Sequence, residues 1–366
     1  MKIVNIQYTG IGGLASVVNT LATAEGSDLH EWVMAYYGVS PIESSHLAFC
    51  EKRGFRYSIF YPKPRNPWIA WLRLASWLIS LQPDAIICHS ITAVPPCIWV
   101  SKRNHIRLIV VEHTPNEVKS TTEWLASIVA MYFADHIVVL TDIYARILSR
   151  CLGPFYISGK VCKINNAIST KLFYPSPLKP PPPSKICVGM AGRLSSSKRQ
   201  DLLIDVASDL PITLMIAGNG DCMEVLRQRA IDANASNVIF SGTIPEVYMP
   251  KWFRSLDIYL HASNGETFSM AILQAMASGL PIIASDISGM DEVLGHDGEC
   301  GFLVANTRYA WRNALCTLTG DPDLRIRMGM AASRRVKTLF DSGFMLRQYL
   351  NLAMGTSLSP NPLSPG

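Results

Sequence analysis

The sequence predicts an α/β protein of two doubly wound, Rossmann-like domains. A length of 366 residues suits two domains better than one. Apolar residues make up 49% of the chain and charged residues 17%, so two cores can be packed and intrinsic disorder is disfavoured. Short apolar runs alternate with longer helical stretches in both halves, a pattern typical of βα units and parallel sheets.

The first half predicts one domain, residues 1–172. Strands are expected where short β-branched or apolar runs occur, at 2–7, 31–35, 56–60, 85–88, 108–111 and 136–140. The longer stretches between these runs predict helices at 14–24, 67–81, 92–102, 121–133 and 142–151.

Residues 173–184 are dense in proline and cannot continue a helix or a central strand, so they predict a stiff linker. A second domain is expected over 185–342, with strands at 186–190, 213–217, 238–241, 257–260 and 281–284. Its helices are expected at 200–208, 221–234, 247–254, 268–278, 310–319 and 323–340.

The end of the chain predicts one more helix, over 343–356, which we expect to pack back on the first domain. The tail 357–366 has no periodicity and is expected to be disordered. Two doubly wound domains joined by a short linker predict a central cleft. In such sheets the ligand lies beyond the carboxyl ends of the strands.

Composition excludes several functions. A net charge of +5 is small for a nucleic-acid-binding surface, so no nucleic-acid partner is expected. The nine cysteines are scattered without a C-x-x-C pair, which favours free thiols in a reducing compartment and predicts no metal site. Asp321 is expected to cap a helix whose first residue is Pro322, rather than to bind metal.

No signal peptide is expected from the N-terminal pattern. The most apolar stretch, about 15 residues around Arg73, is too short and too interrupted to span a bilayer. We therefore expect a cytoplasmic protein, at most attached to the inner face of the cytoplasmic membrane.

The first predicted strand leads into a loop that contains Gly12 and Gly13, and a helix follows. Glycines let a ligand approach the backbone, and a helix N-terminus offers free N–H groups to an anion. A phosphate- or sugar-binding loop and a simple tight turn both stay open. The spacing does not match G-x-G-x-x-G and no acidic residue ends the next strand, which disfavours a dinucleotide cofactor.

The second half places two cations on a loop after a buried strand. Gly192 is followed directly by Arg193, and Lys198 comes five residues later. A guanidinium and an ammonium at the carboxyl end of a strand suit a diphosphate, although a solvated basic turn has the same composition. Gly218 lies in a second glycine turn, at the end of the following strand.

A second constellation surrounds a helix start. Glu266 precedes the predicted helix, and Gln274 lies eight residues later on it. Between them, Phe268, Ser269 and Met270 expose backbone N–H groups, which can hold a phosphate. The carboxylate and the amide can bind hydroxyl groups.

Together these motifs resemble the retaining glycosyltransferases of the GT-B fold, most closely family 4. The resemblance covers both domains. It rests on the first glycine loop, A-G-R-L-S-S-S-K at 191–198, A-G-N-G at 217–220 and E-T-F-S-M-A-I-L-Q-A-M-A-S-G-L-P at 266–281. It implies a nucleotide-sugar donor, transfer with retention of the anomeric configuration, and no cofactor or metal. Cations and a helix N-terminus would stabilise the charge of the leaving diphosphate.

The resemblance also implies roles for single residues. Arg193 and Lys198 would neutralise the diphosphate, and Glu266 would bind hydroxyls of the transferred sugar. His113, which follows a buried strand, would lie near that sugar, with a purely structural histidine as the alternative. The remaining donor-binding candidates are Gly12, Gly13, Gly192, Gly218, Phe268, Ser269 and Met270.

Two further positions concern the nucleoside. Base contacts in this family are largely to the backbone, here around Ile244. Gln274 stands where the family usually has a glutamate that binds the ribose. Its amide oxygen can still accept one hydrogen bond but has lost the charge, at a cost of about 1–2 kcal/mol in donor binding.

Acceptors of this family dock on the N-terminal domain, where one segment combines cations with tryptophans. These candidates are Lys63, Arg65, Trp68, Trp71 and Arg73. Such an edge suits a lipid headgroup region. The alternative is a core helix, which would bury Leu72, Ala75, Leu78 and Ile79.

The sequence therefore predicts transfer of a hexose or N-acetylhexosamine from a nucleotide-diphosphate sugar, with UDP favoured over GDP. The expected acceptor is a glycan or a lipid-linked sugar in cell-surface polysaccharide or glycoconjugate synthesis, with peripheral membrane contact. Two alternatives stay open: a nucleotide-sugar epimerase of the same fold, and a nucleotide-sugar-binding protein without turnover, which the Gln274 departure motivates.

Overall fold

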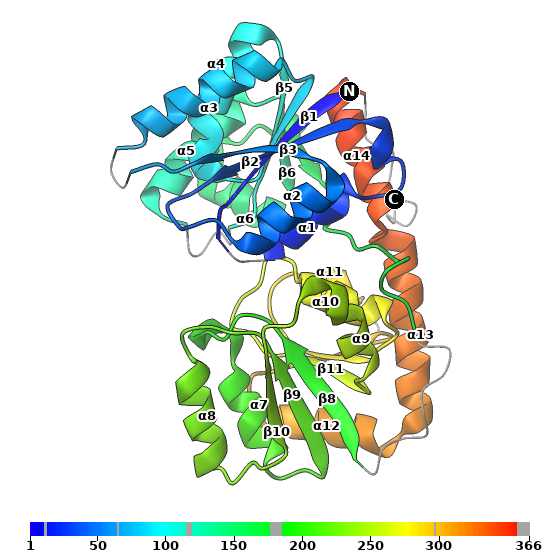
Figure 1. Cartoon of the computed structure of the whole chain (residues 1–366). Helices are drawn as coiled ribbons and strands as arrows, with labels where there is room; N and C mark the ends of the chain where they lie inside the picture. The colour runs from blue at the N-terminus through cyan, green and yellow to red at the C-terminus, as the bar shows by residue number, and fades with distance from the viewer. Residues whose placement is uncertain (11–12, 64–65, 115–118, 176–184, 296–297, 357–366) are drawn as a thin grey trace. The chain divides into compact units, whose positions relative to one another are not determined.

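The computed structural model describes residues 1–10, 13–63, 66–114, 119–175, 185–295 and 298–356 (Figure 1). The chain forms two compact units. The N-terminal unit comprises Met1–Ala167 and Ser342–Gly366, and the C-terminal unit comprises Ile168–Asp341. Residues 176–184 of the predicted linker 173–184 and the whole predicted tail 357–366 lie outside the described residues.

The first boundary falls before Ile168 rather than at the expected residue 172, because the segment after it is bound to the C-terminal unit. The Ile168 N–H donates to the Phe340 carbonyl at 2.9 Å. The Thr170 hydroxyl donates to the Asp341 carboxylate, also at 2.9 Å. Further along, the Phe173 ring packs on a phenylalanine of the same unit.

The N-terminal unit contains a seven-stranded sheet in the order β3-β2-β1-β4-β5-β6-β7, with all paired strands parallel. The strands are β1 (Lys2–Gln7), β2 (Glu31–Tyr37), β3 (Arg56–Phe60), β4 (Ala85–Cys88), β5 (Arg107–Val111), β6 (His136–Val139) and β7 (Val161–Lys163). The helices are α1 (Gly13–Ala22), α2 (Ser44–Arg53), α3 (Trp68–Leu81), α4 (Val94–Asn104), α5 (Thr121–Phe133), α6 (Asp142–Leu152) and α14 (Ser342–Met354).

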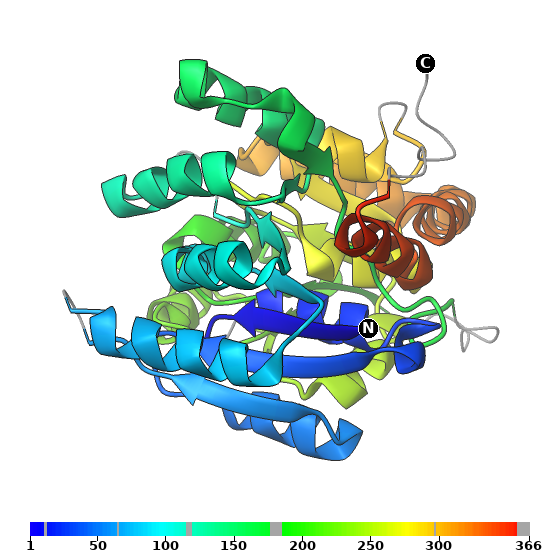
Figure 2. The same ribbon diagram turned by 90° about the horizontal axis from the view of Figure 1, so that it is seen from above.

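Helices cover both faces of this sheet, as a parallel sheet requires. Helices α3 to α6 bury their apolar sides on one face, in a core that includes Val4, Ile6 and Val110. Helix α1 packs on β1 on the other face, and α14 packs on α1 and β5. Figure 2 shows α3 and α4 side by side, in agreement with their contact.

The C-terminal unit contains a six-stranded sheet in the order β10-β9-β8-β11-β12-β13, again parallel throughout. The strands are β8 (Ile186–Ala191), β9 (Ile212–Ala217), β10 (Val238–Gly242), β11 (Ile258–His261), β12 (Ile282–Ser285) and β13 (Gly301–Val304). The helices are α7 (Gln200–Ala207), α8 (Met223–Asp232), α9 (Met249–Arg254), α10 (Met270–Ala277), α11 (Met290–Leu294), α12 (Arg308–Gly320) and α13 (Pro322–Leu339).

The predicted class, two doubly wound parallel sheets, is confirmed. The elements not predicted are short or weakly patterned: β7, β13, α2 and α11. Strand β13 has only four residues, and its pairing with β12 defines it. Such elements depend on tertiary pairing, which periodicity does not reveal.

Helix α3 corrects one expectation. Leu72, predicted as buried in the core-helix interpretation, is 69% exposed. The buried stripe runs through Ala70, Leu74 and Leu78 at the helical spacing, so Leu72 lies on the opposite side. Ala75 is buried as expected.

The nine cysteines are free thiols. No helix among the described residues combines the length and hydrophobicity needed to cross a membrane. Asp321 caps α13 as predicted: its side chain accepts a hydrogen bond from the Leu324 N–H at 2.8 Å, and Pro322 is the first helical residue.

Candidate functional site

The candidate residues on the strand-end loops of the C-terminal unit gather at the carboxyl edge of its sheet, because each loop follows a parallel strand. The loop after β8 carries Gly192 to Lys198, and the loop after β9 begins at Gly218. Ile244 follows β10, and Glu266 follows β11. The candidate residues therefore lie at the edge of the sheet where ligands bind in this class of fold.

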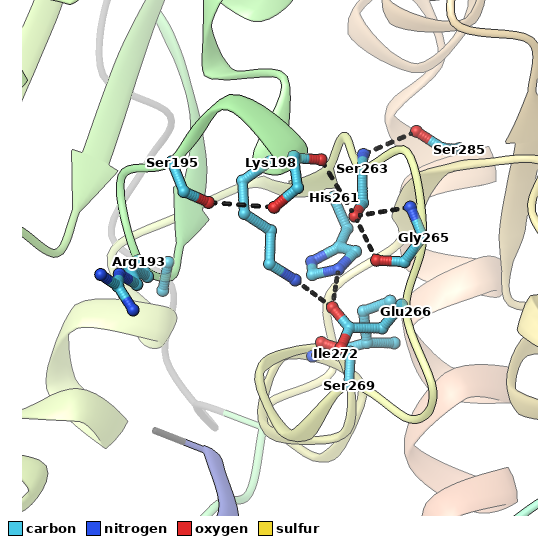
Figure 3. Close-up of polar contacts among 12 residues, drawn as sticks. Arg193, Ser195, Lys198, His261, Ser263, Gly265, Glu266, Ser269, Ile272 and Ser285 are labelled. Carbon is cyan, nitrogen blue, oxygen red and sulfur yellow. Dashed lines mark hydrogen bonds and ion pairs between the residues drawn. The ribbon is translucent and has the colours of Figure 1, made fainter. Parts of the chain in front are cut away.

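Lys198 and Glu266 form a direct ion pair at this edge (Figure 3). Each of the two side chains is 20% exposed. His261, at the end of β11, approaches the same carboxylate oxygen, with its Nε2 at 3.2 Å from Glu266 Oε2. The His261 ring is only 2% exposed. Both protein groups thus meet Oε2, and among the described residues Oε1 of Glu266 has no hydrogen-bond partner.

The environment determines which of these groups are charged. Burial alone would raise the pKa of Glu266, but the hydrogen bond from His261 and the charge of Lys198 outweigh it and hold that pKa at about 2. Burial lowers the pKa of His261 from its usual value. At neutral pH Glu266 is therefore ionised and His261 is neutral, so the His261 proton resides on Nε2, which donates.

A hydrogen-bond network fixes the loop that carries Glu266. The Ser263 N–H donates to the Ser285 hydroxyl at 2.9 Å, and the Ser263 hydroxyl donates to the Gly265 carbonyl at 2.8 Å. Asn306, just after β13, accepts from Ser285 at 2.5 Å and donates to the Ser263 carbonyl at 2.9 Å. These hydrogen bonds connect the loop after β11, the last residue of β12 and the segment after β13.

Helix α10 starts beside Glu266. Ser269 is its N-cap and accepts a hydrogen bond from the Ile272 N–H at 3.4 Å. Among the described residues, the N–H groups of Met270 and Ala271 have no acceptor. Two orphan donors and the positive end of the helix dipole therefore favour an anion at this point.

Two buried residues flank this helix start. Phe268 is 6% exposed and packs edge-on against Phe340, so its side chain belongs to the core. Gln274 is 7% exposed, and its side-chain amide makes no hydrogen bond with the described residues. A buried amide normally has a partner, so this side chain is available to a ligand.

Arg193 does not join the Lys198–Glu266 pair. Its guanidinium donates to Asp221 at 3.0 Å, and the two side chains are 67% and 84% exposed. Figure 3 shows it pointing away from Lys198. A pair as exposed as this contributes about 0–1 kcal/mol, so it is easily broken.

The two candidate glycines of this unit have different surroundings. Gly218 has a φ of +133°, and a Cβ atom built there would lie 1.9 Å from the Gly192 carbonyl oxygen. A Cβ at Gly192 would meet nothing within 4 Å. Gly218 is thus required by backbone packing, whereas Gly192 borders open space. Ile244 is itself half-buried, in a mostly exposed loop after β10.

In the N-terminal unit, His113 lies just after β5 and belongs to a chain of polar groups. Its Nε2 is 2.9 Å from His89 Nδ1, and His89 Nε2 is 3.3 Å from Asn5 Oδ1. Burial lowers the pKa of His113 to about 4 and that of His89 well below its usual range. With both rings neutral and Asn5 Oδ1 accepting, His89 donates from Nε2 and accepts from His113 Nε2.

A buried ion pair lies next to His113. Lys119 Nζ is 2.8 Å from Glu112 Oε2, and the side chains are 0% and 2% exposed. The Ser127 hydroxyl donates to the other Glu112 oxygen at 2.7 Å. The ammonium also lies 4.5 Å from the centre of the Trp124 ring. This network fixes the end of β5, from which His113 projects.

The remaining candidates of the N-terminal unit are the glycines before α1 and the residues of the predicted acceptor segment. Gly13 is the first residue of α1, and Gly12 lies outside the described residues, as does Arg65. Lys63 and Arg73 are exposed. Trp68 is 65% exposed, whereas Trp71 packs partly on the core and donates to the Thr92 carbonyl at 3.2 Å.

Sequence reasoning assigned no role to His261, His89, Asn5, Ser285 and Asn306. A polar residue at a strand end is a weak signal, and only the fold reveals that these strand ends are neighbours. Among the described residues, no group of three or more His, Cys, Asp or Glu side chains is placed to hold a metal ion.

Two family models match the chain. The model of Glycosyltransferase Family 4 matches residues 11–172, and that of the Glycosyl transferases group 1 matches residues 185–321. The chain belongs to glycosyltransferase family 4. The first match covers strands β2 to β7 of the N-terminal sheet, and the second covers all six strands of the C-terminal sheet.

Individual relatives of this family 4 chain are distant. A D-inositol 3-phosphate glycosyltransferase of Pseudarthrobacter chlorophenolicus is 31% identical over 160 residues, which are 40% of this chain and 37% of that protein. The match therefore spans well under half of the relative. A phosphatidyl-myo-inositol mannosyltransferase of Mycobacterium leprae is 25% identical over 276 residues, 72% of each chain.

Solved structures of other proteins share the fold of this chain. The Anabaena protein HepE in complex with UDP-glucose superposes with a TM-score of 0.83 at 19% identity, covering 97% of this chain and all of that one. At this identity the likeness shows the GT-B fold of the family 4 chain.

Proposed function

We propose that this chain transfers a hexose or N-acetylhexosamine from a nucleotide-diphosphate sugar to a glycan or lipid-linked acceptor. The observation that carries the proposal is the Lys198–Glu266–His261 cluster at the carboxyl edge of the C-terminal sheet, beside the orphan N–H groups of α10. A cation, an anion and free amides at one point suit a ligand that carries both a phosphate and sugar hydroxyls.

In the proposed mechanism the leaving diphosphate gains negative charge as the glycosidic bond breaks. Lys198 donates one of its three N–H groups to Glu266, which leaves the other two to donate to the phosphate. The N–H groups of Met270 and Ala271 complete the electrostatic stabilisation, which is usually the largest catalytic contribution.

Glu266 positions the sugar. Oε2 is held by the protein, so Oε1 is the oxygen that accepts from a sugar hydroxyl. Because its pKa is about 2, the carboxylate stays ionised at every working pH and its hydrogen bonds are the strong, charge-assisted kind.

In this proposal Arg193 releases Asp221 and binds the diphosphate instead. The Arg193–Asp221 ion pair is exposed and weak, so breaking it costs little. In this proposal His113 binds the transferred sugar. Gln274 binds the ribose through its side-chain amide, which has no hydrogen-bond partner among the described residues.

A UDP-sugar is the favoured donor, because the Anabaena protein with the same fold was crystallised with UDP-glucose. We propose that transfer retains the anomeric configuration and needs no metal, since the cations above can take the role of a divalent ion.

The acceptor side of the proposal concerns α3. Trp68, Ile69 and Leu72 are 65%, 56% and 69% exposed, and Lys63 and Arg73 accompany them. Exposed aromatic and aliphatic side chains among cations suit the headgroup region of an anionic membrane, where a lipid-linked acceptor resides.

The donor and the reaction are tested together by turnover. The chain is incubated with UDP-, GDP-, ADP- and dTDP-glucose in EDTA and a set of lipid-linked acceptors, and nucleoside diphosphate release is measured. We expect release from one donor class and an α-linked product by NMR. Lys198→Ala should reduce the rate more than Arg193→Ala. A change in donor stereochemistry without an acceptor would instead indicate an epimerase.

The membrane contact is tested by co-sedimentation with vesicles containing anionic phospholipid. Leu72→Ser should reduce binding, whereas Leu125→Ser, a matched change at another exposed leucine of the same unit, should not. Equal binding by both variants would contradict the α3 assignment.

A further inference from the structure

His261 occupies a position that packing does not explain. It ends β11 and lies on the face of that strand that also carries Tyr259, whose ring stacks on it at 6.2 Å between centroids. Tyr259 packs in turn on Phe253. The face is aromatic and the His261 ring is 2% exposed, so an apolar side chain would fit this site without polar atoms to satisfy.

A histidine at this position lowers the stability of the fold through one of its ring nitrogens. Nδ1 is buried and has no hydrogen-bond partner among the described residues. Buried polar atoms nearly always have one, and an orphan lowers stability. The other nitrogen, Nε2, makes a single contact, the hydrogen bond to Glu266 Oε2. The unpaired Nδ1 of His261 thus lowers the stability of the fold, and the hydrogen bond of Nε2 to Glu266 is what this position provides in return.

We propose that His261 is a positioning residue that holds Glu266 Oε2, so that Oε1 is presented to the donor sugar. This inference rests on the proposed function, because it assigns a task to the same carboxylate. The direction of the bond is unambiguous, since an ionised carboxylate only accepts and Nε2 must donate.

The geometry also explains why Lys198 alone is insufficient. Lys198 is a flexible side chain that must engage the phosphate when the donor binds, so its hold on Glu266 changes during the reaction. His261 is carried by a central strand, paired with β8 and β12, and cannot follow the ligand. It thus keeps the carboxylate in place while Lys198 moves.

The test separates the sugar from the nucleotide. The probes are UDP and UDP-glucose, or the corresponding GDP, ADP or dTDP pair if that pair binds more tightly. In His261→Leu we expect affinity for the nucleotide sugar to fall on the order of ten-fold, while affinity for the free diphosphate changes less than about two-fold. The melting temperature should change little, because removal of the orphan Nδ1 offsets the loss of the hydrogen bond to Glu266.

Two isosteric variants provide the matched control. The amide nitrogen of Gln occupies roughly the place of Nε2, and that of Asn the place of Nδ1. His261→Gln should therefore retain nucleotide-sugar affinity within about three-fold, whereas His261→Asn should lose it like His261→Leu. This comparison decides the matter even if His261→Leu does not fold.

The outcomes are distinct. Wild-type affinity in His261→Leu, equal losses in the Gln and Asn variants, or equal losses for UDP and UDP-glucose would each overturn the role of His261 and leave the proposed function intact. If the wild-type chain binds no nucleotide sugar at all, the proposed function fails, and the inference fails with it.

Discussion

The two glycines at the ends of β8 and β9 allow a sharp separation of folding from binding. Gly218→Ala places a methyl group 1.9 Å from the Gly192 carbonyl oxygen, on a residue whose φ is +133°. Gly192→Ala places the same methyl group in open space, on a residue without positive φ. The two changes are chemically identical and lie on the loops after the neighbouring strands β8 and β9.

The expected costs follow from these surroundings. A non-glycine residue in the backbone region of Gly218 costs about 1–3 kcal/mol, and forcing two backbones apart costs about 1–3 kcal/mol more. A total of about 2–6 kcal/mol should lower the melting temperature by roughly 4–24 °C, at about 2–4 °C per kcal/mol for a unit of this size. Gly192→Ala should change stability by less than about 0.5 kcal/mol.

The assay is differential scanning calorimetry of the full chain, followed by titration with nucleotide. Gly218→Ala should melt early, whereas Gly192→Ala should melt like wild type and bind nucleotide more weakly, because its methyl group occupies the ligand side of the edge. Equal melting temperatures for the two variants would refute the packing argument. Unchanged nucleotide affinity in Gly192→Ala would remove that glycine from the site.

Three further predictions concern other groups. Lys119→Met should destabilise the N-terminal unit by about 3–5 kcal/mol in urea unfolding, because Glu112 is left buried and unpaired, and adding Glu112→Gln should restore most of the loss. Burial lowers the pKa of His89 and of His113, the latter to about 4. At a pH below the ordinary histidine pKa, these two side chains therefore bind more protons in the unfolded chain than in the folded chain. The melting temperature should therefore fall as the pH drops from about 6.5 toward 4, and His113→Phe should reduce this dependence. Gln274→Glu should tighten nucleotide binding in calorimetry, and weaker binding would contradict its placement at the ribose.

Much of the fold could be predicted because alternating βα units leave a strong signal. The bounds of β1 (Lys2–Gln7) and β4 (Ala85–Cys88) agree with the predicted ranges. What could not be predicted depends on tertiary contacts: β13 exists through its pairing with β12, and the exposed position of Leu72 depends on which side of α3 meets the sheet.

The candidate site was predictable to a similar degree. Lys198 and Glu266 were expected at the same edge, and the structure joins them directly. Their expected partner Arg193 turns instead to Asp221, because spacing along a loop does not fix the direction of a long side chain. His261 lies only five residues before Glu266, but the contact between them depends on how the intervening loop turns back, which the local sequence pattern does not reveal.

The most direct test of the central claim, that the Lys198–Glu266 edge binds a nucleotide-diphosphate sugar, is calorimetric titration with UDP, GDP, ADP and dTDP and their glucosides in EDTA. Wild type should bind one nucleotide selectively, and Lys198→Ala should weaken both the free diphosphate and the glucoside at least ten-fold. Glu266→Ala should weaken the glucoside far more than the diphosphate. Absence of binding to every nucleotide, or wild-type affinity in Lys198→Ala, would contradict the account.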